Sequence, residues 1–404
     1  MRLVLVGGRL GDGTLADVSL DPASGTILEV GRVDLAESDV VEDVSGMVIL
    51  PAGVEAHAHL DKAFFWTGTI APDLDTGVSE WKGRLGEISH QSFVDRATAC
   101  VERLVAHGTT TIRSHVDVTT IHGLRGVHAL IEVRDQMTRR GIADLELVAL
   151  AGPLGGADSG AIRRLLDEAI EAGVDVVGAS PDIDPDPIGA TTAAVDAAVR
   201  AGRPLDLHTD QTVDPGLFYL PELIRQVRRH DLPGVVASHC VSLATQDIDT
   251  QKRTADALAE AGIAVFTMPL TSLYLFGWEQ QVGPPRGVTA INVLRDAGVV
   301  VAAGSDNVQD TFFPFGRCDP FETANVLALV AHLDPADAWD MCSTAPRIAM
   351  GRPPVEVTPG SRADLVAIEG ANIISALADA SPNRIVVHRG SVVSRTRASA
   401  HLLA

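Results

Sequence analysis

The stretch VILPAGVEAHAHLDK, residues 48–62, decides the fold of this chain. It begins as an apolar run rich in β-branched residues, which favours a buried strand, and it ends in His57 and His59. Residues two apart on an extended strand point to the same side, so both imidazoles can face one ion. Other buried strands that end in polar side chains could bring further ligands to the same ion.

Seven further apolar segments follow, separated by amphipathic stretches of helical length such as 93–107. The expected strands are TTTIRSHVD (109–117), LELVALAG (145–152), VDVVGAS (174–180), LDLHTD (205–210), GVVASHC (234–240), IAVFTMPL (263–270) and VVVAAGSDN (299–307). Eightfold strand and helix alternation predicts an α/β protein with a (β/α)8 barrel, of TIM type, over 51–352. A doubly wound open sheet is the alternative, because continuous apolar strands suit either fold.

The two ends of the chain differ from the middle. Residues 1–50 and 353–404 show short β-type runs with Gly, Asp and Ser turns, and together they predict a small β-sandwich domain built from both termini. The whole chain has 404 residues, with 53 acidic and 32 basic side chains and a net charge of −21. That balance argues against nucleic-acid binding, which needs a basic face. We expect a cytoplasmic homo-oligomer without a membrane span or signal peptide, acting on a small molecule.

Polar side chains stand at the ends of four of the predicted strands. His57 and His59 end the first, His208 the fifth, His239 the sixth and Asp306 the eighth. In a parallel barrel these ends open onto one face, so the side chains should converge. Three imidazoles and a carboxylate leave a coordination position open for water, and a bound divalent ion can lower the pKa of that water to about 7. His239 is either a further ligand or a donor to the water or the substrate oxygen.

These motifs resemble the amidohydrolase superfamily, and within it the cytosine deaminase group of metal-dependent hydrolases. The matching pieces are PAGVEAHAHLDK, TTTIRSHVD, LHTD, SHC, MPLTSLYL, RGVT, and GSDN followed by FFPFGRCDPFETANV. The resemblance implies that His57, His59, His208 and Asp306 hold one Zn or Fe ion. It also implies that His239 contacts the metal-bound hydroxide or the substrate's carbonyl oxygen. No lysine ends the fourth strand, so a lysine bridging two metals is not available.

Two departures from the deaminase pattern concern the substrate. A glutamate that shuttles a proton stands three residues after the fifth-strand histidine in the deaminases, whereas this chain has Gln211, and an amide does not titrate. The glutamine expected after the third strand is replaced, since Gly152 and Pro153 stand there. Gln211 either orients substrate while Asp306 carries out both proton transfers, or leaves the proton to Asp210, or marks a chain that binds without catalysis.

Further residues lie near the predicted strand ends. Asn307 is a candidate substrate contact, and Lys62 either binds substrate or forms a salt bridge with Asp61 or another neighbour. His115 on the second strand has a supporting or substrate-binding role, or it forms a buried structural pair with Asp117. A group of aromatic residues lies in the loops after strands one and eight, where they either pack the loops or line a pocket for a planar ring: Phe64, Phe65, Trp66, Phe312, Phe313 and Phe315.

The sequence thus predicts a metal-dependent hydrolase that breaks a C–N bond of a small cyclic substrate. Hydrolytic deamination of an N-heterocycle is the first expectation, with Asp306 handling the proton and His239 steadying the oxyanion. Hydrolysis of a cyclic or N-substituted amide is the alternative that Gln211 favours. A catalytically inactive ligand-binding barrel is the second alternative.

Overall fold

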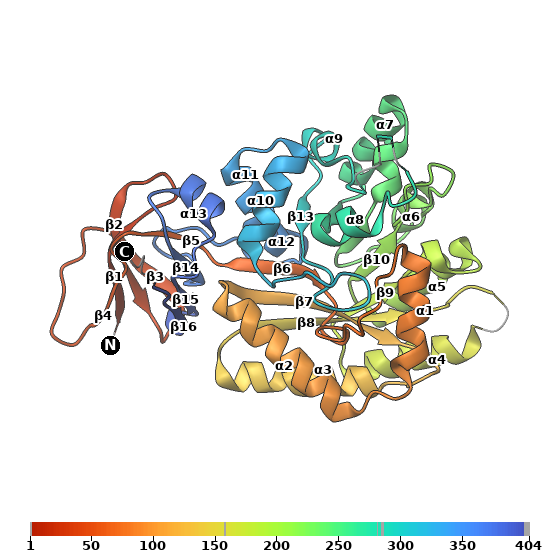
Figure 1. Cartoon of the computed structure of the whole chain (residues 1–404), viewed down its shortest axis with the longest axis horizontal. Coiled ribbons are helices and arrows are strands. Elements are labelled where there is room, and N and C mark those ends of the chain that lie inside the picture. The colour runs from red at the N-terminus through yellow and green to blue at the C-terminus, as the bar shows by residue number, and fades with distance from the viewer. Residues whose placement is uncertain (1, 157–158, 281, 284–286, 400–404) are drawn as a thin grey trace.

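The computed structural model describes residues 2–156, 159–280, 282–283 and 287–399, so Arg286 of the RGVT motif lies outside the described residues. One of its two eight-stranded sheets is made of parallel strands that are neighbours in sequence order. They are β6 (Gly53–Ala58), β7 (Thr109–Val118), β8 (Asp144–Ala151), β9 (Val176–Ala179), β10 (Leu205–Thr209), β11 (Val235–His239), β12 (Ile263–Thr267) and β13 (Val301–Ala303). Figure 1 shows these strands in the larger lobe, with helices around them.

Backbone contacts between the first and last strands close this sheet into a barrel. Ala58 and Asp306 form a parallel bridge. The Asp306 amide donates to the His57 carbonyl at 2.8 Å, and the His59 amide donates to the Asp306 carbonyl at 3.2 Å. Closure confirms the (β/α)8 barrel and rules out the open doubly wound sheet.

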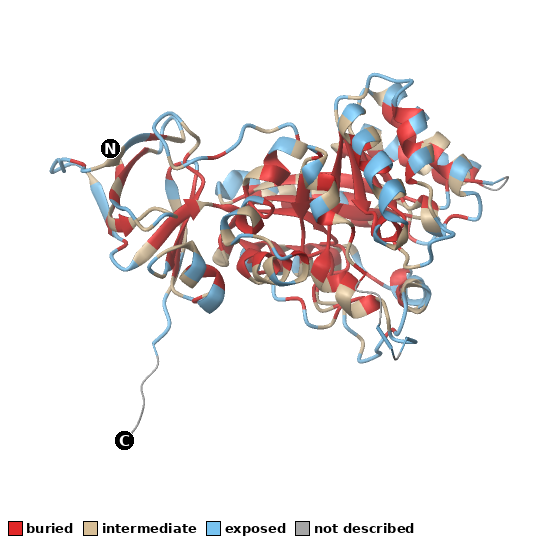
Figure 2. Cartoon of the chain, turned by 90° about the horizontal axis from the view of Figure 1, so that it is seen from above, coloured by how far each residue is buried: buried red, intermediate tan, exposed pale blue. Residues whose placement is uncertain are grey.

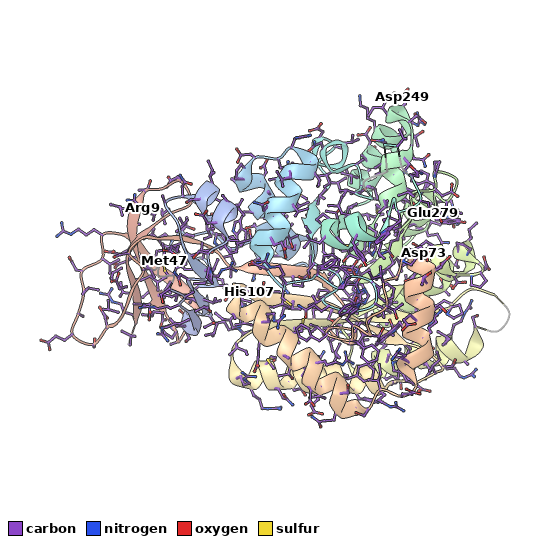
Figure 3. All side chains as sticks on the ribbon, in the orientation of Figure 1. Arg9, Met47, Asp73, His107, Asp249 and Glu279 are labelled. Atoms are coloured by element: carbon purple, nitrogen blue, oxygen red, sulfur yellow. The ribbon has the colours of Figure 1, made fainter. Side chains whose placement is uncertain are left out.

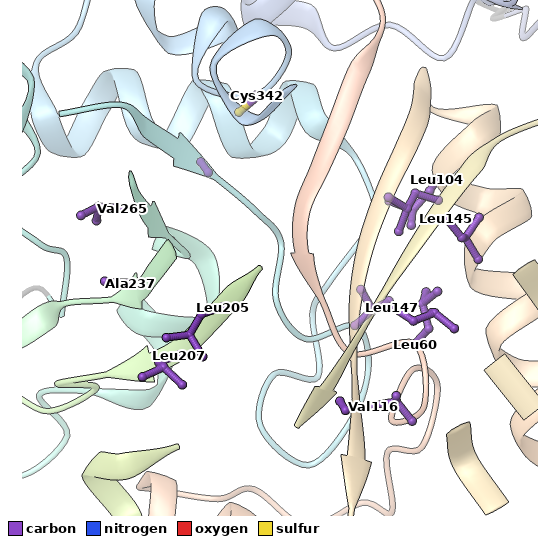
Figure 4. Packing of buried hydrophobic residues seen from close by; sticks show 14 of the residues in the cluster. Leu60, Leu104, Val116, Leu145, Leu147, Leu205, Leu207, Ala237, Val265 and Cys342 are labelled. Carbon is purple, nitrogen blue, oxygen red and sulfur yellow. The ribbon is translucent and has the colours of Figure 1, made fainter. Parts of the chain in front are cut away.

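The helices that follow the strands pack around the barrel. They are α1 (Leu74–Leu85), α2 (His90–Ala106), α3 (Arg125–Arg140), α4 (Gly160–Ala172), α5 (Pro187–Ala201), α6 (Leu220–Val227), α7 (Ile248–Glu260), α8 (Pro269–Leu275), α9 (Ile291–Asp296), α10 (Pro320–Ala331), α11 (Pro335–Asp340) and α12 (Thr344–Ala349). Two short 3₁₀ turns, η1 (Pro181–Ile183) and η2 (Val241–Thr245), follow β9 and β11. Figure 4 shows how Leu104 of α2 and Leu145 of β8 bury apolar side chains in the layer between helices and strands.

The two ends of the chain form the second, smaller β domain, as the sequence predicts. Its strands are β1 (Leu3–Arg9), β2 (Leu15–Asp21), β3 (Thr26–Gly31), β4 (Val40–Asp43), β5 (Met47–Pro51), β14 (Leu365–Glu369), β15 (Arg384–His388) and β16 (Ser391–Thr396), with α13 (Ile373–Asp379) beside them. Antiparallel pairing of β5 with β14 joins the two ends. Figure 2 shows a buried interior in each lobe.

The segment 48–59 is two strands in the structure, not one. β5 belongs to the small domain and β6 begins the barrel, and the chain passes between them at Ala52. Both strands are apolar because each enters a core, so periodicity alone could not separate them. In Figure 3, Met47 lies in the small domain, whereas Asp73, at the start of α1, lies at the far end of the barrel.

None of the helices in the described residues is both long and apolar enough to cross a bilayer.

Candidate active site

The five predicted strand-end residues meet at one end of the barrel. Ligand atoms of His57, His208 and His239 lie within 4.8 Å of one another, and so do those of His57, His59 and Asp306. The parallel register explains this convergence, since each side chain ends a strand at the same edge of the sheet.

The atoms in this cluster suit a cation. Asp306 Oδ1 lies 3.3 Å from His59 Nε2 and 3.8 Å from His57 Nε2. Among the described residues, buried His57 Nε2, both ring nitrogens of His239 and Asp306 Oδ2 lack a hydrogen-bond partner. Buried polar atoms usually have partners, and a divalent ion would satisfy several of these at once.

The electrostatics of the cluster also favour a cation. Burial, and secondarily the neighbouring imidazoles, lowers the pKa of His57 and His239 well below the ordinary value. Burial, with Lys62 adding to it, lowers the pKa of His208 to about 3. The histidines are therefore neutral and offer lone pairs. Burial and then Asp310 raise the pKa of Asp306 well above its usual range, so its carboxylate gains from a facing cation.

Two of these side chains reach the cluster through an unusual backbone conformation. His239 has φ of 72° and Asp306 has φ of 65°, both in the left-handed region. Side chains alternate along a strand, so Ser238 and His239 would ordinarily face opposite sides. The left-handed residue breaks that alternation, and both side chains then face the cluster. Strained backbone of this kind is common where function requires it.

A second layer of buried residues supports the cluster from below. Ser238 Oγ lies 3.1 Å from His57 Nδ1 and donates to Asp206 Oδ1 at 2.7 Å. His115 is fully buried, with its ring centroid 4.0 Å from that of His57. This placement favours the supporting role that the sequence offered for His115. Sequence reasoning missed Asp206, although its position two residues before His208 on the same strand face was a usable signal.

A cavity of about 280 Å³ opens above the cluster. His59, His208 and Asp306 line its floor. Its walls combine apolar and polar groups, and they include Leu74, Val78, Trp81, Thr119, Leu150, Ser180, Ile183, Asp184 and Phe312. A cavity of this size can hold a small molecule in contact with the cluster.

Lys62 lines the cavity but is firmly held by carboxylates. Its Nζ donates to Asp117 Oδ1 at 2.7 Å and to Asp61 Oδ2 at 3.4 Å, and it lies 3.2 Å from His59 Nδ1. Although burial disfavours the ammonium, Asp117 and Asp61 outweigh it and raise the pKa of Lys62. Trp81 Nε1 donates to the other oxygen of Asp117 at 2.6 Å. The lysine is therefore a fixed cation beside the floor of the cavity.

Gln211, Asn307 and Gly152 also line the cavity, as the sequence suggested. Asn307 Nδ2 donates to Asp310 at 2.8 Å, which leaves its carbonyl oxygen free to accept. Asp210 accepts from the amides of Tyr219 at 2.7 Å and Leu220 at 3.0 Å, so its carboxylate holds the start of α6. This geometry disfavours Asp210 as the proton carrier.

Of the aromatic residues predicted to wall the cavity, Phe312 lines it, whereas Phe64, Trp66 and Phe313 do not. Phe64 packs on the guanidinium of Arg103, with 4.7 Å between the guanidinium carbon and the ring centroid. Trp66 is 50% exposed. Phe313 packs on Tyr274, with ring centroids 5.6 Å apart. Trp81 of α1 also lines the cavity, and this contact was missed because Trp81 is not close in sequence to a strand end.

Known proteins resemble this chain over nearly its whole length. The amidohydrolase family model matches residues 92–394. Pterin deaminase of Rhizobium rhizogenes is 30% identical over 398 residues, covering 95% of this chain and 87% of that protein. The crystal structure of 5-methylcytosine deaminase from Klebsiella pneumoniae liganded with phosphonocytosine superposes with a TM-score of 0.87 at 25% identity, covering 99% of this chain and 100% of that one. N-isopropylammelide isopropylaminohydrolase from Burkholderia multivorans gives a TM-score of 0.84 at 27% identity, covering 98% and 99%. By the residues at the strand ends, the closed barrel and these similarities, the chain belongs to the amidohydrolase family.

Proposed function

We propose that this protein hydrolytically deaminates a small planar N-heterocycle. The observation that carries the proposal is the cluster of His57, His59, His208, His239 and Asp306, of which His59, His208 and Asp306 line a cavity that Trp81 and Phe312 also line. The similarity to a pterin deaminase and a 5-methylcytosine deaminase supports an amino-substituted ring as the substrate.

His57, His59, His208 and Asp306 would hold one divalent ion, Zn or Fe. Bound there, the ion supplies Lewis acidity and makes water a nucleophile near neutral pH. Asp306 Oδ2, which has no hydrogen-bond partner among the described residues, takes the proton from the attacking water and returns it to the leaving nitrogen. His239 donates to the oxygen that gains negative charge.

The atoms of the reaction balance without a further reactant. The ring carbon gains the oxygen of one water and loses its amino nitrogen. That nitrogen leaves as ammonia after gaining one proton of the water, and the second proton stays on the product, on the ring nitrogen beside the new carbonyl group. Lys62 and Asn307 are placed to orient ring heteroatoms, because both reach the cavity beside the floor. Gln211 lines the same wall and contributes hydrogen bonds but no titratable proton.

Hydrolysis of a cyclic or N-substituted amide is the second candidate. Gln211 favours it, since it replaces the glutamate that serves proton transfer in the deaminases. Opening an amide needs one carboxylate that accepts the proton of water and delivers it to the leaving nitrogen, and Asp306 can do both. An inactive binding barrel is the third candidate.

An ammonia-release screen on the purified protein separates the three candidates. The panel contains amino-pyrimidines, triazines, pterins, creatinine-like rings and cyclic amides, and metal content is measured on the same preparation. We expect ammonia from at least one amino-heterocycle, lost in His57→Ala and kept in His90→Ala, whose side chain is exposed on α2. Ring opening without ammonia would favour the amide reaction, and metal-independent binding without turnover would favour the third candidate.

The variant Gln211→Glu tests the role of the amide. If Asp306 alone transfers the proton in a native deamination, the added carboxylate changes kcat by less than about tenfold. A rise of ammonia release by more than about a hundredfold would show that the native reaction is not deamination.

A further inference from the structure

Below the candidate cation site, four buried side chains from four strands form a continuous hydrogen-bonded chain. Arg113 of β7 donates from Nη1 to Asp206 Oδ2 of β10 at 2.9 Å. Ser238 of β11 donates from Oγ to Asp206 Oδ1 at 2.7 Å. His57 Nδ1 of β6 lies 3.1 Å from the same Oγ. Each of these residues is at most 1% exposed.

The proton count along this chain fixes the tautomer of His57. A carboxylate only accepts hydrogen bonds, so the Ser238 hydroxyl donates its single proton to the hydrogen bond with Asp206. The permanently charged guanidinium of Arg113 holds Asp206 in place. Toward His57 the hydroxyl oxygen can then only accept. The proton of the neutral imidazole therefore sits on Nδ1, and the lone pair sits on Nε2. Nε2 is the nitrogen that lies 3.8 Å from Asp306 Oδ1.

Packing holds the ring plane from a second direction. The ring of His115 lies 4.0 Å from that of His57, centroid to centroid, at an interplanar angle of 34°. With one nitrogen bonded and one face covered, His57 has little freedom to rotate about its side-chain bonds.

We propose that Ser238, held by Asp206 and Arg113, is a positioning residue that sets the tautomer and orientation of His57 for metal binding. The proposal rests on the proposed metal-dependent function. A hydrogen bond to the second ring nitrogen of a metal-binding histidine commonly increases metal affinity by about 10- to 100-fold.

A second cation held by His57, His115 and Asp206 is the rival explanation, because their ligand atoms also lie within 4.8 Å of one another. Both oxygens of Asp206 are already engaged, one by Ser238 and one by Arg113. A cation placed there would also face the charge of Arg113. We therefore expect one ion per chain, and two ions in the wild-type protein would overturn the proposal.

Metal affinity of the full-length protein is the first test. Apparent dissociation constants for zinc are measured by competition with a chelator for wild type, Ser238→Ala, Ser238→Thr and Ser242→Ala. Ser238→Ala should weaken binding by about 10- to 100-fold, whereas Ser238→Thr, which keeps a hydroxyl, should recover most of it. Ser242 is a matched control, since it is a fully buried serine of η2 whose amide donates to the Asp210 carbonyl. Equal affinity in wild type and Ser238→Ala would overturn the proposal.

The tautomer of His57 is a second readout, and it needs no metal. Nitrogen-15 spectra of the metal-free protein, assigned with His57→Gln, should show His57 protonated at Nδ1 in wild type and a mixture in Ser238→Ala. Urea unfolding of each metal-free variant shows whether it folds. If wild type binds no divalent ion, the proposed function fails while the tautomer still tests the hydrogen-bonded chain. An unchanged tautomer in a folded Ser238→Ala would overturn the positioning role.

Discussion

At the scale of single residues, Trp81 joins the protein core to the candidate site. Its side chain is 2% exposed, lines the cavity and donates from Nε1 to Asp117, which in turn holds Lys62. The indole thus forms part of the apolar wall and, through Asp117, holds the Lys62 ammonium beside the floor of the cavity. Substrate orientation should be sensitive to this one donor, because the group it serves is a buried carboxylate.

We predict that Trp81→Phe raises KM by about tenfold with a smaller change in kcat. The phenyl ring keeps most of the wall but loses a hydrogen bond to a charged group, worth about 1.5 kcal/mol. Steady-state kinetics on the substrate found in the ammonia screen checks this. Trp339→Phe is the matched control, since Trp339 is equally buried but stacks on Phe321, with ring centroids 4.2 Å apart, outside the cavity. Equal effects of the two substitutions on KM would contradict the assignment.

At the scale of elements, Glu55 of β6 fastens the first barrel strand to the last. Its Oε1 accepts from the Ser305 amide at 2.8 Å and from the His57 amide at 3.2 Å. β13 is only three residues long, so few backbone hydrogen bonds remain to close the barrel there. The carboxyl group takes the place of the missing ladder bonds and sets the height of Asp306 relative to His57.

We predict that Glu55→Ala lowers the free energy of unfolding by about 2 to 5 kcal/mol, because two buried amides lose their acceptor. Glu55→Gln keeps an acceptor oxygen and should cost much less at low pH. Urea unfolding of metal-free protein measures both variants. Similar losses for Ala and Gln at pH 5 would mean that side-chain volume matters more than the hydrogen bonds.

The same position should make stability depend on pH. Burial raises the pKa of Glu55 to about 7 against an ordinary value of 4.5. The folded state therefore holds this proton more tightly than the unfolded state, so its contribution to stability falls as pH rises from about 4.5 to 7. The glutamine side chain does not titrate. The free energy of unfolding of Glu55→Gln should therefore increase relative to that of wild type as pH rises through this window. A constant difference between pH 4 and 8 would contradict the raised pKa.

At the scale of the whole molecule, a cluster of charges couples the small β domain to the bottom of the barrel. Asp144, which begins β8, is 3.6 Å from His388 Nε2 and accepts from Arg362 at 2.7 Å. His388 Nδ1 also lies 3.0 Å from Asp364. Burial opposes the charge on His388, but the two carboxylates outweigh it and raise its pKa. Asp144 and Asp364 have lowered pKa values, since His388 and Arg362 outweigh their burial.

We predict that His388→Gln destabilises the protein most between about pH 4 and 6.5. Because the folded pKa of His388 is raised, its contribution to the free energy of unfolding is complete below the unfolded pKa of about 6.5. That contribution is lost as pH rises through the folded pKa. Asp144 and Asp364, whose pKa values are lowered, contribute to the free energy of unfolding above about pH 4. Their contribution is lost as pH falls further. The free energy of unfolding, measured with urea from pH 3 to 9, should be lower in His388→Gln than in wild type by about 1 to 3 kcal/mol within this window and by less outside it. His90 is an exposed histidine paired with Glu132 and serves as the control. His90→Gln should lower the free energy of unfolding by less than about 0.5 kcal/mol at every pH.

The sequence by itself determined the barrel and the set of residues that meet at its end. Apolar runs alternating with helical stretches are local patterns, and four of these runs end in the histidines or the aspartate of the site. Parallel strands necessarily bring those ends to one edge. The tertiary structure decided how these residues work together. The left-handed backbone at His239, the contact of Ser238 with both His57 and Asp206, and the folding of Trp81 over the cavity depend on groups far apart in the chain. Regular strand alternation would place the side chains of Ser238 and His239 on opposite faces, and the left-handed backbone at His239 departs from that alternation.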